Sequence, residues 1–400
     1  MKQEEMERME IDLSLKLAGV ELKNPIIVSA SEFSRRGAVI KEISKYGPAA
    51  IVTKTIVAQP VPHVRPCYAA IEGGFINCVS GSDISAEQWF KEEIRVAKEG
   101  EAKVIASIAG RFLEESLELA RKAEEAGADM IEYATACPHL AEIYNAMFPG
   151  SMGPPEVHNP EPLAKTLAEI KKVVSIPVIP KFSAIFYIDA VKWAKAAEAA
   201  GADAIAAADA LGPVLQINIE TGQPLLGGPK GSGGLTGSAI KPLVLKMVLD
   251  IAENVNIPVI GVGGISKWKD AIEYFMAGAR CVGLATAVHV KGPSIIPQIL
   301  DGIKKFLVEK GYSSLDEIIG LTSRKIKERE IKGKQLITTP KVPAIDAVKC
   351  NACGLCQRAC IYGAISVEDI ARVDPSKCFG CGLCVTICPT KAISLDYYED

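Results

Sequence analysis

The sequence predicts an α/β fold in which parallel strands alternate with helices and close into a barrel. Strand-like apolar runs separated by helical patterns continue over about 300 residues. Three near-copies of one motif, at 125–131, 199–205 and 276–282, each combine a helix end, a glycine cap and the start of a strand. Because these repeats continue without a visible switch, a (β/α)8 TIM barrel is favoured over an open doubly wound sheet.

The expected elements follow from the chain in order. Apolar runs at 24–30, 49–54 and 103–107 predict the first three strands. A fourth begins at Met130, and two similar runs, 175–181 and 256–262, are entered through Ile-Pro turns. Helical patterns are expected at 114–126, 162–173, 190–200 and 295–310, the last as the final barrel helix.

One insertion interrupts this pattern. Residues 59–83 are rich in proline and glycine and are long for a connection between a strand and a helix. Loops of this length are often functional, so the insertion is a candidate functional segment.

Composition limits the functional classes. The chain is 48% hydrophobic and 23% charged, which is typical of a globular protein with a sizeable core. A net charge of -3 gives no basic footprint for nucleic acid. No apolar run reaches about 18 residues, and the charged first 22 residues do not resemble a signal peptide, so neither a membrane helix nor secretion is expected.

The last part of the chain predicts a separate metal-binding domain. We expect a barrel at 1–320, a basic and polar linker at 321–342 and a small α+β domain at 343–400. Two runs with the spacing C-x2-C-x2-C-x3-C, the second followed by Pro389, match the bacterial two-cluster ferredoxin pattern. Since the fourth cysteine of each run ligates the other cluster, one [4Fe–4S] is expected on Cys350, Cys353, Cys356 and Cys388, and a second on Cys360, Cys378, Cys381 and Cys384.

Two alternatives remain for these cysteines. Zinc sites are disfavoured because they usually need only pairs of ligands separated by longer gaps. Clusters that merely stabilise a small domain are the other alternative, although two adjacent clusters usually move electrons. Thiolates at ligand spacing indicate a reducing compartment, and a cytoplasmic location is expected.

Glycine-rich loops predict an anion site in the barrel. Residues 261–265 follow one strand and 283–286 follow the next, where barrels commonly bind a phosphate through backbone N–H groups. The competing interpretation, a dinucleotide fingerprint, lacks its G-x-G-x-x-G pattern. Lys54 and Lys181 stand at strand ends, where we expect them to neutralise an anionic ring or a phosphate.

Cys137 is the candidate for the chemistry. It stands at the carboxyl end of a strand, because Pro138 cannot continue a central strand, and a stretch rich in Gly, Pro and Met follows at 147–160. Packing as a small apolar residue, acting as a nucleophile and acting as a general acid or base are three interpretations. Its place at a strand end favours a functional role.

These residues together resemble the dihydroorotate dehydrogenase superfamily. Within it, the chain is most similar to the flavin- and pyrimidine-binding part of dihydropyrimidine dehydrogenase with its terminal ferredoxin domain. The similarity covers nearly the whole chain. The motifs that carry it are the double cysteine run and residues 53–55, 74–77, 136–139, 180–181, 219–222, 233–237 and 263–264.

The resemblance implies an FMN at the top of the barrel, with Cys137 transferring a proton while the flavin transfers a hydride. It implies substrate contacts from Asn77, His139 and Asp209. The positions implied for flavin binding are Ala30, Ser31, Lys54, Thr55, Lys181, Gly233, Gly234, Gly263, Gly264, Gly283, Ala285 and Thr286.

The departures from the family pattern concern the substrate. Ala134 stands where the family has an asparagine, and Asp209-Ala210 stands where Asn-Thr is expected. A site built to hydrogen-bond an imide discriminates strongly through such groups. The adjacent alanines at 206–208 indicate a roomier pocket, so a substrate other than uracil, thymine or orotate is expected.

The sequence thus predicts an FMN-dependent oxidoreductase acting on a C–C bond beside a carbonyl, with electrons passing through two [4Fe–4S] clusters. One alternative is a true dihydropyrimidine or dihydroorotate dehydrogenase. The other is an electron-transfer subunit whose barrel has lost its own substrate. No nicotinamide fold is visible, so a ferredoxin or an NAD(P)H-oxidising flavoprotein subunit is the expected partner, in a homo-oligomer or hetero-oligomer.

Overall fold

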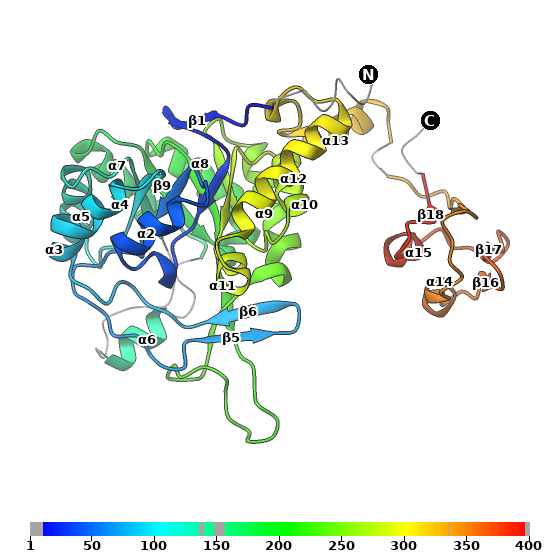
Figure 1. Cartoon of the computed structure of the whole chain (residues 1–400), viewed down its shortest axis with the longest axis horizontal. Helices are drawn as coiled ribbons and strands as arrows, with labels where there is room; N and C mark the ends of the chain where they lie inside the picture. Colours follow the sequence, from blue (N-terminus) through cyan, green and yellow to red (C-terminus); the bar gives the residue numbers. More distant parts are fainter. Residues whose placement is uncertain (1–10, 136–139, 148–156, 335, 397–400) are drawn as a thin grey trace. The chain divides into compact units, whose positions relative to one another are not determined.

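A computed structural model describes residues 11–135, 140–147, 157–334 and 336–396 (Figure 1). The chain divides into two compact units, Met1–Lys325 and Ile326–Asp400, and each is described by itself. The division falls inside helix α13 (Leu321–Ile331), within the range that the sequence indicated as a linker. Cys137 and His139 lie outside the described residues.

The first unit contains a closed barrel of parallel strands, which confirms the predicted fold class. Each strand pairs with the next barrel strand along the chain, and the last pairs with the first. Their apolar runs are buried on both faces, as expected for parallel strands covered by helices. The strands are β3 (Ile26–Val28), β4 (Ala50–Val52), β7 (Lys103–Ile108), β8 (Met130–Ala134), β9 (Val178–Ser183), β10 (Ile205–Asp209), β13 (Val259–Val262) and β14 (Cys281–Leu284).

Amphipathic helices cover the outside of the barrel (Figure 1). In α5, the buried residues Ser116, Leu119, Ala120 and Ala123 recur at helical spacing, so one face packs on the strands while the glutamates face solvent. These helices are α2 (Gly37–Ser44), α3 (Ala86–Gln88), α4 (Ile94–Lys98), α5 (Leu113–Glu125), α7 (Glu161–Val173), α8 (Ala190–Ala199), α9 (Lys241–Ala252), α10 (Trp268–Ala277) and α12 (Ile295–Lys310). Two further helices, α6 (Leu140–Met147) and α11 (Thr286–Lys291), lie at one end of the barrel.

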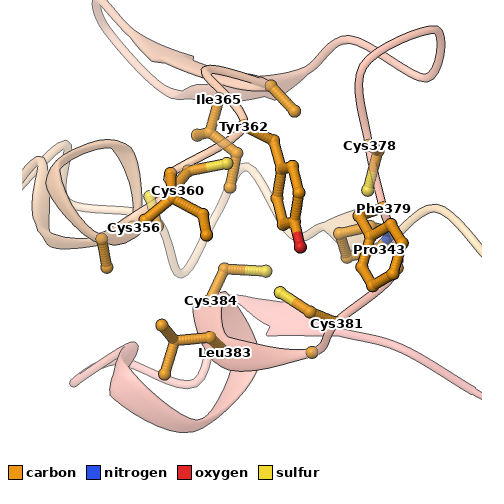
Figure 2. Close-up of a pocket in the computed structure, with 15 residues that line it drawn as sticks. Pro343, Cys356, Cys360, Tyr362, Ile365, Cys378, Phe379, Cys381, Leu383 and Cys384 are labelled. Atoms are coloured by element: carbon orange, nitrogen blue, oxygen red, sulfur yellow. The ribbon is translucent and has the colours of Figure 1, made fainter.

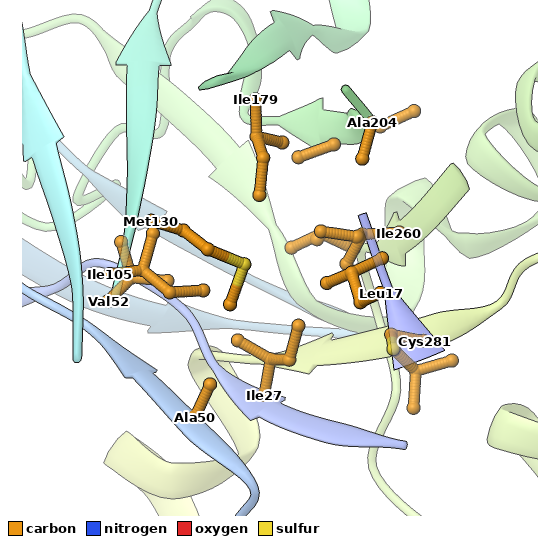
Figure 3. Close-up of a cluster of buried hydrophobic side chains, with 14 of the residues drawn as sticks. Leu17, Ile27, Ala50, Val52, Ile105, Met130, Ile179, Ala204, Ile260 and Cys281 are labelled. Carbon is orange, nitrogen blue, oxygen red and sulfur yellow. The ribbon is translucent and has the colours of Figure 1, made fainter. Parts of the chain in front are cut away.

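Side chains fill the barrel interior, so the barrel is a packed core and not a pore (Figure 3). Met130 and Ile105 point inward from neighbouring strands, and both are at most 1% exposed. Leu17, from the small hairpin β1 (Leu15–Leu17) and β2 (Val20–Leu22), joins this cluster. Because the interior is closed by apolar side chains, the polar groups of a site must gather at a rim of the barrel.

The insertion at 59–83 forms a hairpin, β5 (Tyr68–Ile71) and β6 (Gly74–Asn77). This hairpin pairs with β12 (Gly233–Thr236), which in turn pairs with β11 (Leu211–Val214), giving a four-stranded antiparallel sheet. Since β11 directly follows β10, the sheet begins at the carboxyl ends of the barrel strands. That is the rim where barrel enzymes place their sites.

The second unit contains a small α+β domain with two similar halves. Each half has a short helix, α14 (Leu355–Ala359) or α15 (Leu383–Ile387), that follows a glycine with positive φ, Gly354 or Gly382. Glycine is suited to this left-handed position because it has no Cβ. Two antiparallel strand pairs complete the domain: β15 (Ala344–Ile345) with β18 (Ile393–Ser394), and β16 (Ile365–Val367) with β17 (Ala371–Val373).

Among the described residues, no helix combines the length and the apolar character needed to span a membrane.

Candidate active site

A cavity of about 270 Å³ opens at the carboxyl ends of the barrel strands. It is bordered by residues in or directly after β3, β9, β10, β13 and β14, far apart in the sequence. Many of the predicted flavin and substrate positions meet here. Those lining the cavity are Ala30, Lys181, Asp209, Gly263, Gly264, Gly283, Ala285 and Thr286.

One end of the cavity is built from backbone. Gly263 and Gly264 have φ values of 147° and 69°, a region that favours glycine. A Cβ on Gly264 would lie 2.7 Å from the carbonyl oxygen of Gly237, so the loop after β13 packs closely against the turn after β12. Helix α11 begins beside them at Thr286, and the first N–H groups of a helix have no partner within the helix.

Lys291 adds a cation to this end, and the sequence analysis did not identify it. Its Nζ donates to the carbonyl oxygen of Ser266 at 2.9 Å, and both residues line the cavity. The turn itself is fixed by Tyr274, whose hydroxyl donates to the Gly263 carbonyl at 2.7 Å. Free backbone N–H groups next to a positively charged lysine can bind a phosphate group. The Ser266 carbonyl holds the lysine in place for this contact.

Lys181 lies elsewhere on the cavity wall and is 6% exposed. Its Nζ is 3.5 Å from a carboxylate oxygen of Glu132 and 3.5 Å from one of Asp209. Burial opposes the charge, but the carboxylates of Asp209 and Glu132 hold the pKa of Lys181 above its ordinary value. Burial raises the pKa of Glu132 against the attraction of Lys181. In either protonation state of Glu132, the three groups carry no surplus positive charge.

The remaining predicted positions among the described residues do not line this cavity. Lys54 is buried, and its Nζ lies 2.7 Å from a carboxylate oxygen of Glu32. Thr55 and Ser107 share a hydrogen bond of 3.1 Å between their hydroxyls, and Ser31 is hydrogen-bonded to His289. Asn77, Gly233 and Gly234 belong to the antiparallel sheet, where Asn77 is the backbone partner of Gly234.

The eight cysteines of the two runs line two pockets in the second unit. Figure 2 shows the larger of these two. Cys350, Cys353, Cys356 and Cys388 line one pocket. The other, of about 220 Å³, is lined by Cys360, Cys378, Cys381 and Cys384, with Cys356 at its border. The sulfurs of Cys360, Cys378, Cys381 and Cys384 point toward a shared space in Figure 2. This grouping is the one that the spacing of the cysteines predicts.

Backbone amides support some of these sulfurs. The N–H of Ala371 donates to Cys350 Sγ at 3.4 Å, and the N–H of Ala392 donates to Cys388 Sγ at 3.3 Å. Hydrogen bonds to the sulfurs stabilise thiolate ligands and tune cluster potentials.

The residues that line the cavity at the barrel rim fit an FMN. The cavity joins a phosphate-type end, made by Gly264, Thr286 and Lys291, to a wall that carries the buried Lys181. Ligand sites of this kind are concave and largely apolar, with a few convergent polar groups. Fold and site thus define a β/α-barrel enzyme of the flavin-binding type, joined to a ferredoxin-type unit.

Comparison with known proteins identifies the family. The sequence model described as dihydroorotate dehydrogenase matches residues 12–307, and the chain belongs to this family. Residues 371–394 match the 4Fe-4S binding domain. These matches confirm the resemblance to the dihydroorotate dehydrogenase superfamily, the ferredoxin-type domain and the oxidoreductase class that the resemblance implied.

Curated relatives agree with this assignment. The "Dihydroorotate dehydrogenase B (NAD(+)), catalytic subunit" of Methanothermobacter thermautotrophicus is 35% identical over 310 residues, covering 77% of this chain and 98% of that protein. The protein of the same name from Methanosarcina acetivorans is 39% identical over 76% of this chain and 94% of its own length. The Pyrococcus furiosus protein, also of that name, is 34% identical over 78% and 100%, respectively.

Proposed function

We propose that this chain is an FMN-dependent oxidoreductase that adds or removes hydrogen across a C–C bond beside a carbonyl. The convergence of the predicted flavin positions on one cavity at the barrel rim carries this proposal. When bound, FMN supplies hydride transfer at this site. Membership of the dihydroorotate dehydrogenase family supports the same reaction class.

The protein's own residues have separate roles in this proposal. Gly263, Gly264 and Lys291 hold the phosphate, while Lys181 stands beside the ring with its charge balanced by carboxylates. Cys137 carries the proton, as its match to the family motif implies. His139 and Asn77 are proposed to contact the substrate.

We propose two [4Fe–4S] clusters in the second unit, which exchange electrons with the flavin one at a time. The division of eight cysteines between two pockets supports this number. The external partner is a ferredoxin or an NAD(P)H-oxidising flavoprotein subunit. The relatives' printed name, a catalytic subunit, supports a hetero-oligomeric partner.

The cofactor content tests this proposal directly. Protein purified without oxygen is expected to contain about eight iron atoms, eight acid-labile sulfides and one FMN per chain, because each pocket has four thiol ligands. Iron and sulfide assays, with chromatography of the released flavin, provide the measurement. Stoichiometric zinc without labile sulfide contradicts the clusters, and release of FAD contradicts the flavin site.

We further propose that the substrate is not a standard pyrimidine, since Ala134 and Asp209 replace groups that pair with an imide. Changing Asp209→Asn together with Ala134→Asn is expected to strengthen pyrimidine binding by roughly tenfold or more, because the imide groups regain complementary partners. The measurement is anaerobic flavin reduction by dihydrouracil, dihydrothymine and dihydroorotate, with Asp209→Asn alone for comparison. Efficient turnover of any of these by the wild type refutes the proposal.

A further inference from the structure

The buried Lys181 receives its two carboxylates from the neighbouring barrel strands. Lys181 lies on β9, which pairs with β8 on one side and with β10 on the other. Glu132 comes from β8 and Asp209 from the end of β10, and each places a carboxylate oxygen 3.5 Å from Lys181 Nζ. Because all three residues belong to adjacent strands of one closed barrel, the sheet itself brings their charges together.

Asp209 is the carboxylate of this group that faces the cavity. Its side chain is 34% exposed and lines the cavity, whereas the Glu132 side chain is 6% exposed and does not. The register of β10 against β9 shifts between Ala207 and Asp209, and such irregularities re-aim side chains next to active sites. The N–H of Ala210 donates to Asp209 Oδ1 at 2.7 Å, which leaves Oδ2 for Lys181. Asp209 therefore presents its charge to a ligand in the cavity together with Lys181.

The net charge of this group matters for a ring that becomes more negative on reduction. A lysine with a free positive charge beside a flavin favours the reduced state of the ring, and a carboxylate beside the lysine opposes this effect. Burial raises the pKa of Glu132, which favours the neutral form of the enclosed carboxyl group. Asp209 is then the carboxylate that balances Lys181, and charges at the wall of a partly enclosed cavity are less screened than charges in water.

We propose that Asp209 lowers the reduction potential of the bound flavin by cancelling the positive charge that Lys181 presents to the ring. This inference rests on the proposed function and names a residue that tunes it. Asp209 acts through Lys181, so it is a positioning residue rather than a catalytic one. Electrons reach and leave the ring by the routes already proposed, the substrate and the clusters, and a lower flavin potential suits exchange with low-potential [4Fe–4S] clusters.

An anaerobic redox titration of the full-length holoenzyme measures this potential, with the flavin followed by absorbance and the clusters by electron paramagnetic resonance. Asp209→Asn replaces the charge with a neutral group of nearly the same shape, so the flavin potential should rise. At a fixed potential, the ratio of reduced to oxidised flavin should increase roughly tenfold or more, which is about 30 mV for a two-electron couple. Asp209→Glu keeps the charge and should shift the ratio less than Asp209→Asn.

Asp203→Asn is the matched control. Asp203 lies just before β10, its side chain is 30% exposed, and its carboxylate is 2.6 Å from Lys171 Nζ. It does not line the cavity, which opens at the carboxyl ends of the strands. The control variant therefore removes the same charge from a lysine pair at the opposite end of the same strand, and it should leave the flavin potential at the wild-type value.

The inference is overturned if Asp209→Asn has the wild-type potential or a lower one, or if Asp203→Asn raises the potential equally. Loss of FMN from Asp209→Asn would also overturn it, because a lysine released from its carboxylate should hold the ring at least as well. Wild-type protein without FMN contradicts the proposed function instead. Flavin-loaded variants with an unchanged potential contradict only the role of Asp209.

Discussion

Replacing Cys137 with alanine is expected to slow the chemical step by roughly 10²–10⁴-fold, the usual contribution of a positioned general acid or base. The flavin and the clusters should stay in place, because their proposed ligands lie on other segments of the chain. The measurement is anaerobic stopped-flow reduction of the flavin by a substrate found by screening compounds with a C–C single bond beside a carbonyl. Iron and FMN contents of the variant are measured on the same preparation.

Two further variants separate proton transfer from other effects of the change. Cys137→Ser should keep part of the activity, since a hydroxyl carries a proton but is a far weaker acid. Cys281→Ala alters a cysteine that is fully buried in the barrel, and it should leave the rate of flavin reduction unchanged. A fully active Cys137→Ala enzyme would remove the thiol from the mechanism and favour the electron-transfer-subunit hypothesis.

The barrel could be predicted because its signals are local. Apolar runs such as 103–107 and the glycine-capped motif ending at Ile131 fix strand positions from neighbouring residues alone. The antiparallel sheet could not be predicted in this way. Its strands are only four residues long, two begin with glycine, and β6 pairs with β12 across about half of the barrel sequence. Pairing at such separation leaves no periodic signal in either strand.

In the candidate site, too, contacts between residues far apart in the sequence could not be predicted. Lys54 and Lys181 could be located at strand ends from the sequence, but their partners could not. Glu32 and His63 reach Lys54 from the loop after β3 and from the insertion, and only the closed barrel brings them together. The sequence therefore indicated two cations for an anion, whereas the structure pairs both with carboxylates. The cysteine runs could be interpreted from the sequence alone, because their spacing predicted which four cysteines line each pocket.

Removing both clusters is expected to slow electron delivery to the flavin by roughly 100-fold or more, because the clusters are the proposed one-electron carriers. The change combines Cys353→Ala with Cys381→Ala, which removes one ligand from each pocket. The barrel should retain its FMN, since its cavity lies in the other unit. The matched control combines Cys67→Ala with Cys281→Ala, two cysteines outside the runs.

The most direct test of electron flow through the clusters is anaerobic rapid mixing of the full-length protein with a one-electron donor. Absorbance reports the flavin, and electron paramagnetic resonance of frozen samples reports the reduced clusters. In the wild type and in the Cys67→Ala/Cys281→Ala control, cluster reduction should precede flavin reduction. In Cys353→Ala/Cys381→Ala, the rate of flavin reduction should fall by roughly 100-fold or more. Equal rates of flavin reduction with and without the clusters would contradict electron transfer through the clusters and leave the second unit a structural role.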